Sequence, residues 1–209
     1  MKQWQYNSYE EYVKAQIDGI YKHPTVKDNY NYEWANKKEI QFIVDEIINP
    51  YFHALNINPT RGVCHGAKLG KENMWFSEAS EIDWIGTDIV IETNEKMNLY
   101  NWDFNKENKE WENTFDVIYS NSFDHAYDAR QTLKNWSLSL KDNGIIILEH
   151  SRNDIQITKT DPFGATLEEY KTLIQELNFE LIDVFNFSSI KNRTNFELSY
   201  LTFKKNKLH

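Results

Sequence analysis

The chain has 209 residues, a formal net charge of −9 at pH 7 and one cysteine, Cys64. This length suffices for one α/β domain with a complete core, and the acidic balance argues against a nucleic-acid backbone or an anionic membrane as the main partner. One cysteine excludes an internal disulfide and favours a reducing compartment. No apolar run approaches the roughly 20 residues of a membrane span. We therefore expect one cytoplasmic domain, residues 1–209, that binds neither membrane nor nucleic acid.

The first 55 residues predict a helical cover over a core formed by residues 56–209. Residues 1–32 are rich in tyrosine and have no strand pattern. Residues 37–55 have apolar side chains at helical spacing, with Pro50 at a kink or an end. We expect the cover to lie over the open end of a sheet, where four tyrosines either close the pocket as a lid or simply pack: Tyr6, Tyr9, Tyr12 and Tyr30.

Short apolar runs alternate with helical patterns along the rest of the chain. Four runs are typical of buried parallel strands: residues 62–64, 84–87, 115–119 and 144–148. Three segments between and after them predict helices: residues 71–79, 129–140 and 167–177. Residues 180–187 and 196–203 then predict a hairpin whose second strand is antiparallel, joined by a polar turn at 188–195. The fold class is α/β, a doubly wound, mostly parallel sheet with helices on both faces.

Three of the seven glycines lie close together, at Gly62, Gly66 and Gly70. They fall in a strand–turn–helix, the place where such sheets bind nucleotides, and glycine allows backbone to approach a ligand because it has no Cβ. The dinucleotide pattern G-x-G-x-x-G is absent, which favours a ligand without pyrophosphate. A purely structural turn is the alternative for this segment taken alone.

Acidic residues follow at the ends of later segments. Asp88 comes 22 residues after Gly66 and ends the second strand, where a carboxylate can accept both ribose hydroxyls; the alternative is a turn cap. Asp103 stands between Trp102 and Phe104, a set that can stack on an adenine and bond its amino group. The two aromatic residues can equally be ordinary core.

This order of signals resembles the class I S-adenosylmethionine (SAM) dependent methyltransferases over residues 61–149. The usual motif is acid-x-Gly-x-Gly-x-Gly, and here Gly62 is matched to the acid, Cys64 to the first glycine and Lys68 to the third. The resemblance implies a seven-stranded Rossmann-like sheet with an antiparallel last strand, SAM as cofactor, and Lys68 pairing with the SAM carboxylate. It assigns eleven residues to the cofactor: Gly62, Cys64, His65, Gly66, Lys68, Asp88, Trp102, Asp103, Phe104, Ser120 and Asn121.

The segment SNSFDHAYD, residues 120–128, follows the predicted strand at residues 115–119 and predicts the site of chemistry. His125 is the candidate general base, because an unperturbed imidazole titrates near neutrality, and Asp124 or Glu149 can orient it. The alternative is that Asp124 caps the next helix and His125 is a solvated loop residue. Four residues are candidates for the acceptor pocket: Tyr127, Glu149, His150 and Arg152.

The same segment resembles the D-G-D-H-S-Y turn of metal-dependent sugar O-methyltransferases. Ser122 stands where that turn has its first acid, so a divalent metal is possible but not favoured. Asp124, Glu149 and His150 are the candidate ligands for a softer ion.

We therefore expect SAM-dependent methyl transfer to a small polar acceptor. The resemblance implies O-methylation of a sugar, a sugar nucleotide or a phosphorylated precursor of surface glycan. The alternative is a SAM-fold protein that binds a nucleoside or a partner without turnover. An NAD-dependent oxidoreductase is disfavoured, because G-x-G-x-x-G and a Tyr-x-x-x-Lys pair in the crevice are both absent.

Overall fold

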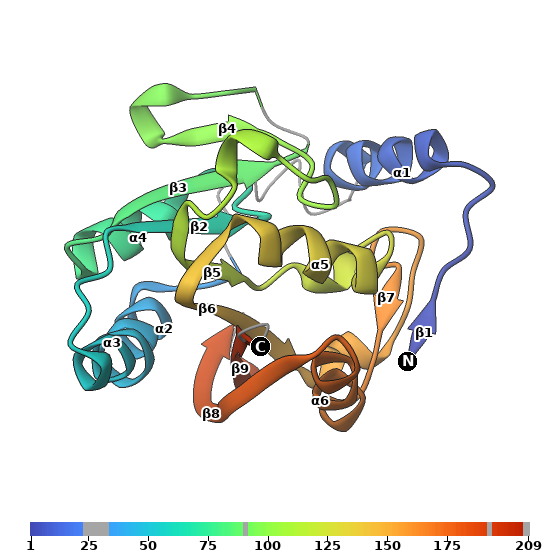
Figure 1. Ribbon diagram of the computed structural model, residues 1–209. Helices are drawn as coiled ribbons and strands as arrows, with labels where there is room; N and C mark the ends of the chain where they lie inside the picture. Colours follow the sequence, from blue (N-terminus) through green and yellow to red (C-terminus); the bar gives the residue numbers. More distant parts are fainter. Residues whose placement is uncertain (23–33, 90–91, 192–193, 207–209) are drawn as a thin grey trace.

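Seven strands form one sheet in the order β4-β3-β2-β5-β6-β9-β8 (Figure 1). The computed structural model describes residues 1–22, 34–89, 92–191 and 194–206. The strands β2 to β6 pair in parallel, and β9 runs antiparallel to both of its neighbours, which confirms the predicted fold class. Their bounds are β2 (Arg61–His65), β3 (Asp83–Asp88), β4 (Leu99–Asn101), β5 (Phe115–Ser120), β6 (Leu140–Ser151), β8 (Phe179–Lys191) and β9 (Thr194–Lys205).

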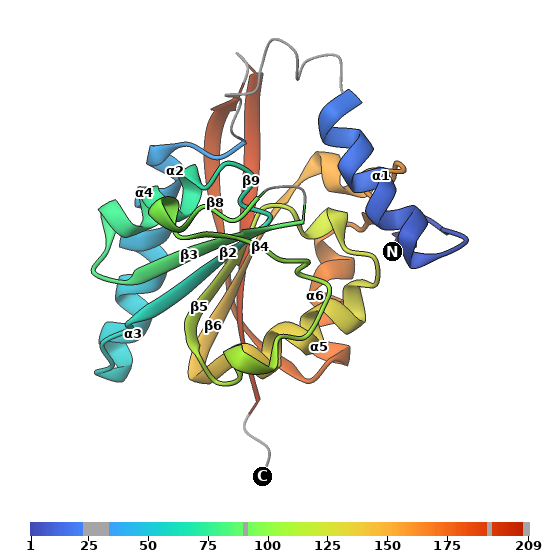
Figure 2. The ribbon, with the colours of Figure 1, turned by 90° about the horizontal axis from the view of Figure 1, so that it is seen from above.

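Helices cover both faces of this sheet, as Figure 2 shows. One face carries α2 (Lys37–Phe42), α3 (Asn49–Leu55) and α4 (Lys71–Ala79); the other carries α5 (Ala129–Ser139) and α6 (Leu167–Glu176). Each face has its own core cluster, centred on Ile43, Phe76 and Tyr119 on the first and on Leu133, Trp136 and Tyr170 on the second. Within the part of the chain that the structure describes, every helix is too short or too polar to cross a membrane.

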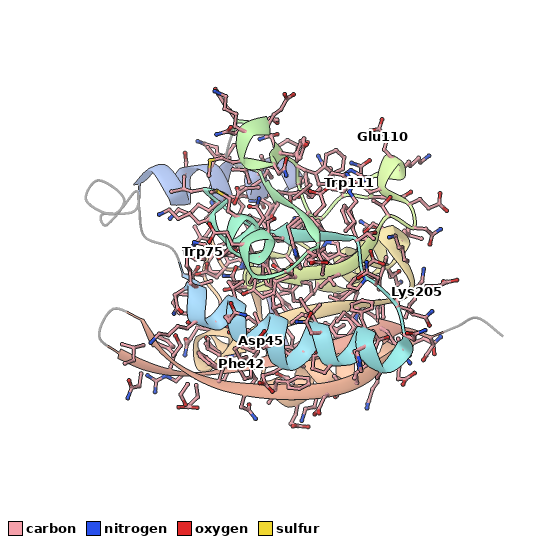
Figure 3. All side chains as sticks on the ribbon, turned by 90° about the vertical axis from the view of Figure 1, so that its left-hand side faces the viewer. Phe42, Asp45, Trp75, Glu110, Trp111 and Lys205 are labelled. Carbon is pink, nitrogen blue, oxygen red and sulfur yellow. The ribbon has the colours of Figure 1, made fainter. Side chains whose placement is uncertain are left out.

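The predicted helix at residues 37–55 is one helical segment with a wide turn inside it. Asn36 and Glu39 form a capping box at its start, and the π-helical turn η1 (Ile43–Ile48) separates α2 from α3. Pro50, the second residue of α3, has no N–H and its ring displaces the preceding carbonyls, and a wider turn accommodates both effects. Figure 3 shows this segment, with Phe42 and Asp45 on it, lying along the sheet; the Phe42 ring is 4.8 Å from that of Phe187 in β8.

Besides the short strands β1 (Lys2–Gln3) and β7 (Phe163–Gly164), which the sequence did not predict, three differences from the predicted elements concern the seven-stranded sheet. β4 was not predicted, because only Leu99 of its three residues is buried and the apolar signal is too short. Residues 188–191 and 194–195, predicted as turn, belong to the hairpin strands, since polar side chains on a solvent-facing strand hide the alternation. β6 begins at Leu140 rather than at 144, because Leu140 already pairs with Phe115.

The N-terminal segment reaches the edge of the sheet where the parallel strands end. β1 (Lys2–Gln3) pairs with β7 (Phe163–Gly164) in a separate two-stranded sheet, and α1 (Tyr9–Lys22) follows. Figures 1 and 2 place α1 on the α5 side of the sheet, apart from α2 and α3. Residues 34–55 thus pack on a sheet face as part of the core, whereas α1 lies as a cover over the strand ends; both statements concern the described part of the first 55 residues.

Candidate cofactor and acceptor site

The turn between β2 and α4 contains three residues with positive φ in five positions. They are Gly66 at 78°, Lys68 at 46° and Gly70 at 74°, and Gly70 is also the N-cap of α4. The amides of Gly66 and Ala67 both donate to the carbonyl of Thr87 in β3, at 2.9 Å each. The turn is therefore tied to the neighbouring strand, and its shape is set by left-handed backbone that favours glycine.

These angles correct the expected match to the methyltransferase motif by two residues. The three positive-φ positions repeat every second residue, as the motif glycines do, so they correspond to Gly66, Lys68 and Gly70. Cys64 then stands at the acid position. Gly62 lies in the first half of β2, where a Cβ would come within 2.5 Å of the Trp84 ring. Position 62 therefore requires a glycine for packing against Trp84 in the core, and not for the ligand turn.

Cys64 and His65 are buried on opposite faces of β2. Cys64 is in the core beneath α2 and α4, where burial raises the pKa of its thiol well above the ordinary value. The His65 ring packs at a tilt against Trp136, with ring centroids 4.6 Å apart, and hydrogen-bonds Thr87 Oγ1 at 2.8 Å. Burial lowers the pKa of His65 to about 3, so its imidazole is neutral. Both side chains support the turn from below instead of facing a ligand above it.

Asp88 fastens the turn to the end of β3. Its Oδ2 accepts the Lys68 amide at 2.9 Å, and its carbonyl accepts the Trp102 amide at 3.1 Å. The side chain is 7% exposed. The carboxylate therefore lies at the carboxyl ends of β2 and β3, where a ribose would sit.

Asp103 is the second carboxylate at this edge. Its Oδ1 accepts from the backbone amide of Asn105 at 3.0 Å and from Asn105 Nδ2 at 2.9 Å, and Tyr9 of α1 donates its hydroxyl to Oδ2. Phe104 is core against Trp136, as the alternative interpretation held. Trp102 is half-buried against Trp111, with ring centroids 5.6 Å apart.

Ser120 and Asn121 tie the end of β5 to the glycine turn. Ser120 Oγ donates to the His65 carbonyl at 2.9 Å and accepts the Ser122 amide at 3.1 Å. Asn121 Nδ2 donates to Glu72 Oε1 at 2.8 Å, at the start of α4. A Cβ at Gly66 would lie 2.6 Å from Ser122 Cβ, so the two loops touch closely where the sheet order reverses.

We expect Asp88→Ala to weaken SAM binding by about 1.5–3 kcal/mol, the scale of a charge-assisted hydrogen bond. The variant loses the carboxylate and also its bond to the Lys68 amide. Titration calorimetry measures the change. Asp88→Asn retains an acceptor for that amide and separates the two effects, while Asp83→Ala, at the exposed start of the same strand, is the matched control. Unchanged affinity of Asp88→Ala would exclude the assigned register.

His125 lies at the end of the short 3₁₀ turn η4 (Phe123–His125), beyond β5. Its Nδ1 is 2.9 Å from Gln16 Oε1 of α1, and its Nε2 is 3.5 Å from Asp161 Oδ1 and 3.9 Å from Asp124 Oδ1. Thr158 holds Asp161 by donating to its Oδ2 at 2.8 Å. Asp128, not Asp124, caps α5 by accepting the Gln131 amide, so the capping alternative for Asp124 was wrong.

Burial raises the pKa of the Asp124 carboxyl to about 7, and the nearby carboxylates of Asp154 and Asp161 raise it further while His125 opposes them. Burial likewise raises the pKa of Asp154, whose carboxylate accepts from Ser151. Among the described residues, Asp124, His125 and Asp161 form the group of His, Cys, Asp or Glu side chains whose ligand atoms all lie within 4.8 Å of one another. They are the residues that can hold a cation here.

Glu149 and His150 do not join this group, which corrects their expected roles. As neighbours on one strand they point to opposite faces. Glu149 accepts from Trp34 and from the Tyr119 hydroxyl on the α2 face. His150 bonds the Ala165 carbonyl at 3.0 Å on the α6 face. Glu149 thus cannot orient His125, and the pair cannot share one ion.

Arg152 and Tyr127 have different aromatic neighbours. The Arg152 guanidinium lies 5.7 Å from the centre of the Phe196 ring in β9. Tyr127 belongs to an aromatic group that we call the tyrosine cluster, in which it contacts three tyrosines of the N-terminal segment at 4.9–6.0 Å: Tyr6, Tyr9 and Tyr12. Tyr30, the fourth tyrosine of the predicted lid, lies outside the described residues.

The tyrosine cluster links α1 both to the Asp103 loop after β4 and to the His125 turn after β5. The Tyr12 hydroxyl donates to the His125 carbonyl at 3.0 Å and accepts from Asn105 Nδ2 at 2.8 Å. Burial raises the pKa of Tyr6 to about 12 and raises those of Tyr9 and Tyr12 further. The three phenols are therefore neutral hydrogen-bond donors. A hollow of about 400 Å³ borders the cluster, lined by residues 1–6, residues 127–130, Phe163 and Leu173.

We expect Asp124→Asn to change how stability depends on pH. A carboxyl whose folded pKa is about 7 instead of 3.8 binds its proton more tightly in the folded state, so wild-type stability falls as pH rises from 4 to 7 and then levels off. The asparagine side chain of the variant has no such proton, and the variant should be more stable at pH 8 by on the order of 2–4 kcal/mol. Urea unfolding across this range measures it. Asp142→Asn, at an exposed carboxylate, should keep the wild-type profile; parallel curves for Asp124→Asn would contradict the raised pKa.

Solved structures that are similar to this chain include methyltransferases and a cyclase. The Burkholderia thailandensis 1,6-didemethyltoxoflavin-N1-methyltransferase, with bound 1,6-didemethyltoxoflavin and S-adenosylhomocysteine (SAH), has a TM-score of 0.71 at 13% identity, over 97% of this chain and 92% of that one. The plantazolicin methyltransferase BpumL in complex with SAH has a TM-score of 0.63 at 14% identity, over 94% and 96%. The [4+2]-cyclase SpnF has a TM-score of 0.63 at 11% identity, over 93% of each chain.

The chain therefore has the fold of the class I SAM-dependent methyltransferases. No protein-family model matches its sequence, and no curated protein is similar to it in sequence. At 11–14% identity these likenesses show the fold alone.

Proposed function

We propose that this protein is a SAM-dependent methyltransferase acting on a small polar acceptor, with O-methylation as the reaction. One observation carries the proposal: the left-handed turn after β2 is bonded to the buried carboxylate of Asp88, while Asp103 follows β4 and His125 follows β5 at the same sheet edge. This is the edge at which open α/β sheets bind ligands. The toxoflavin enzyme and BpumL, which share the fold, have SAH bound.

The residues at this edge fit the parts of SAM. Asp88 would accept hydrogen bonds from the ribose hydroxyls, and Asp103 would accept one from the adenine amino group. In this structure Tyr9 donates its hydroxyl to Oδ2 of Asp103. The turn excludes a Cβ at Gly66, where it packs against Ser122, and its backbone would line the methionine end. The turn amides of Gly66, Ala67 and Lys68 are already bonded to Thr87 and Asp88. SAM supplies an electrophilic methyl group on a sulfonium. The chain's own contribution is to align the acceptor and, through His125, to take the proton from its hydroxyl.

The acceptor that we propose is a hydroxyl-bearing molecule such as a sugar or a sugar nucleotide. The Asp124-His125-Ala126-Tyr127 segment, with its resemblance to sugar O-methyltransferases, supports this choice. Transfer to nitrogen is the alternative acceptor chemistry, as in the name of the toxoflavin enzyme.

A second candidate function is ligand binding without methyl transfer. Two observations favour it: Lys68 stands at a motif glycine with a positive φ, and Tyr9 occupies the acceptor oxygen that adenine would need. SpnF, which shares the fold, is named for a cyclisation.

Calorimetry with SAM and with SAH, followed by transfer of labelled methyl to a panel of hydroxyl and amine acceptors, tests the proposal. We expect both ligands to bind and at least one hydroxyl acceptor to be methylated. Binding without transfer to any acceptor would favour the second candidate. Binding of neither ligand would end both the methyltransferase proposal and the assigned roles of Asp88 and Asp103.

A further inference from the structure

Gln16 of α1 is a buried amide whose orientation is fixed from both ends. Its Nε2 donates to the Thr160 carbonyl at 2.9 Å, and its side chain is only 7% exposed. A carbonyl can only accept a hydrogen bond, so the NH₂ group of the amide must face Thr160. The other end, Oε1, then faces His125 Nδ1 at 2.9 Å.

This orientation determines which ring nitrogen of His125 carries the proton. Oε1 of an amide can only accept, so Nδ1 must be the protonated nitrogen of the neutral imidazole. Nε2 is then the nitrogen with the free lone pair. The backbone of His125 is held in the turn η4, where its amide donates a hydrogen bond to the Ser122 carbonyl at 3.1 Å. With the backbone held, the hydrogen bond at Nδ1 also fixes the plane of the ring.

The surroundings of Nε2 are suited to receiving a proton. Asp161 Oδ1 at 3.5 Å and Asp124 Oδ1 at 3.9 Å are too far to bond the neutral ring, but both are within ion-pair distance of an imidazolium. Thr158 holds Asp161 in this position. A proton taken up at Nε2 would therefore be stabilised by Asp161, and also by Asp124 when its carboxyl is ionised, at the moment when the proton leaves the acceptor.

From this geometry we propose that Gln16 is a positioning residue for His125: it holds the imidazole in the Nδ1–H tautomer, so that Nε2 faces the acceptor as the general base. The inference deepens the proposed methyl transfer and rests on it. It also places part of the reaction machinery on α1, outside the residues that match the methyltransferase motifs.

Two substitutions at Gln16 separate its chemistry from its packing. Gln16→Met keeps the length of the side chain and removes the acceptor, whereas Gln16→Glu retains an acceptor for Nδ1–H. Gln41→Met is the matched control, since Gln41 is an exposed glutamine that bonds Asp45 on α2. ¹⁵N-edited NMR over a pH series reports which nitrogen of His125 is protonated, with His125→Ala to assign the signals.

We expect the Nδ1–H tautomer in the wild type and in Gln16→Glu, and a mixture of tautomers in Gln16→Met. Turnover of Gln16→Met should fall at least about tenfold, within the range that general base catalysis supplies, with SAM affinity unchanged and an altered pH–rate profile. Gln16→Glu should recover most of the rate.

An Nε2–H tautomer in the wild type, or the same tautomer and rate in Gln16→Met, would overturn the inference. So would loss of turnover on chelation that a divalent cation restores, because Nε2 would then be a ligand. The tautomer is measured without methyl transfer. Failure of the proposed function would therefore appear as absent turnover with the Nδ1–H signal intact, and failure of this inference as a wrong tautomer in an active enzyme.

Discussion

His125→Ala should lower the rate of methyl transfer by about 10²–10⁴-fold while leaving SAM affinity nearly unchanged. This range of rate loss is the rate enhancement that general base catalysis typically supplies for a hydroxyl acceptor. The substitution spares the backbone contacts of the turn, because Tyr12 bonds the carbonyl of residue 125 and not its ring. Single-turnover kinetics with saturating SAM measures the loss, and His53→Ala, at an exposed histidine of α3, is the control.

Activity should also fall on the acidic side, since a protonated imidazole cannot accept the proton of the acceptor. Burial raises the pKa of the Asp124 carboxyl to about 7, so the profile of Asp124→Asn is needed to separate the two groups. A His125→Ala enzyme with near-normal turnover would leave acceptor alignment alone as the mechanism. Activity abolished by a chelator would instead assign Asp124, His125 and Asp161 to a metal.

Gly66→Val should abolish measurable SAM binding while the far-UV circular dichroism spectrum stays that of the wild type. A β-branched residue at a φ of 78° stores about 1–3 kcal/mol of backbone strain. Its Cβ would also lie 2.6 Å from Ser122 Cβ, so the turn must move away from the end of β5. That movement separates the Lys68 amide from Asp88 and deforms the surface against which the ligand would lie.

Gly66→Asn is the informative companion, because asparagine tolerates the left-handed region and retains only the steric conflict. Weak but measurable binding by this variant, beside none for valine, would assign part of the loss to backbone conformation. Normal binding by Gly66→Val would show that the ligand does not contact this turn. A collapse of the spectrum in both variants would assign the glycine to folding alone.

The sheet could be predicted because its central strands are buried on both faces. Residues 145–148 are apolar without interruption and residues 115–119 are apolar except for Asp116, and the glycines and Asp88 follow strands that these runs already define. The register of the glycine motif could not be predicted, since it depends on backbone angles: Lys68 has the φ of a glycine without being one.

The site beyond β5 was predictable only in part. His125 was visible from its place after a strand, and the alternation of side chains along a strand was available as a signal that Glu149 and His150 face opposite ways. Gln16 and Asp161 had no such signal. They are isolated polar residues 109 positions before His125 and 36 after it, and only tertiary packing brings them to its ring.

The position of α1 in the chain has a consequence for biosynthesis. This helix is translated early, yet its partners Asp103, His125 and Thr160 follow 94, 109 and 144 residues after the side chains that contact them. Long-range closure of this kind is slow, because the chain loses entropy before the contacts form. In a nascent chain, Gln16 of α1 cannot form its hydrogen bond to Thr160 until residue 160 has left the ribosome. Because Gln16 is held by the Thr160 carbonyl, a stalled or truncated product that ends before residue 160 would lack an oriented His125.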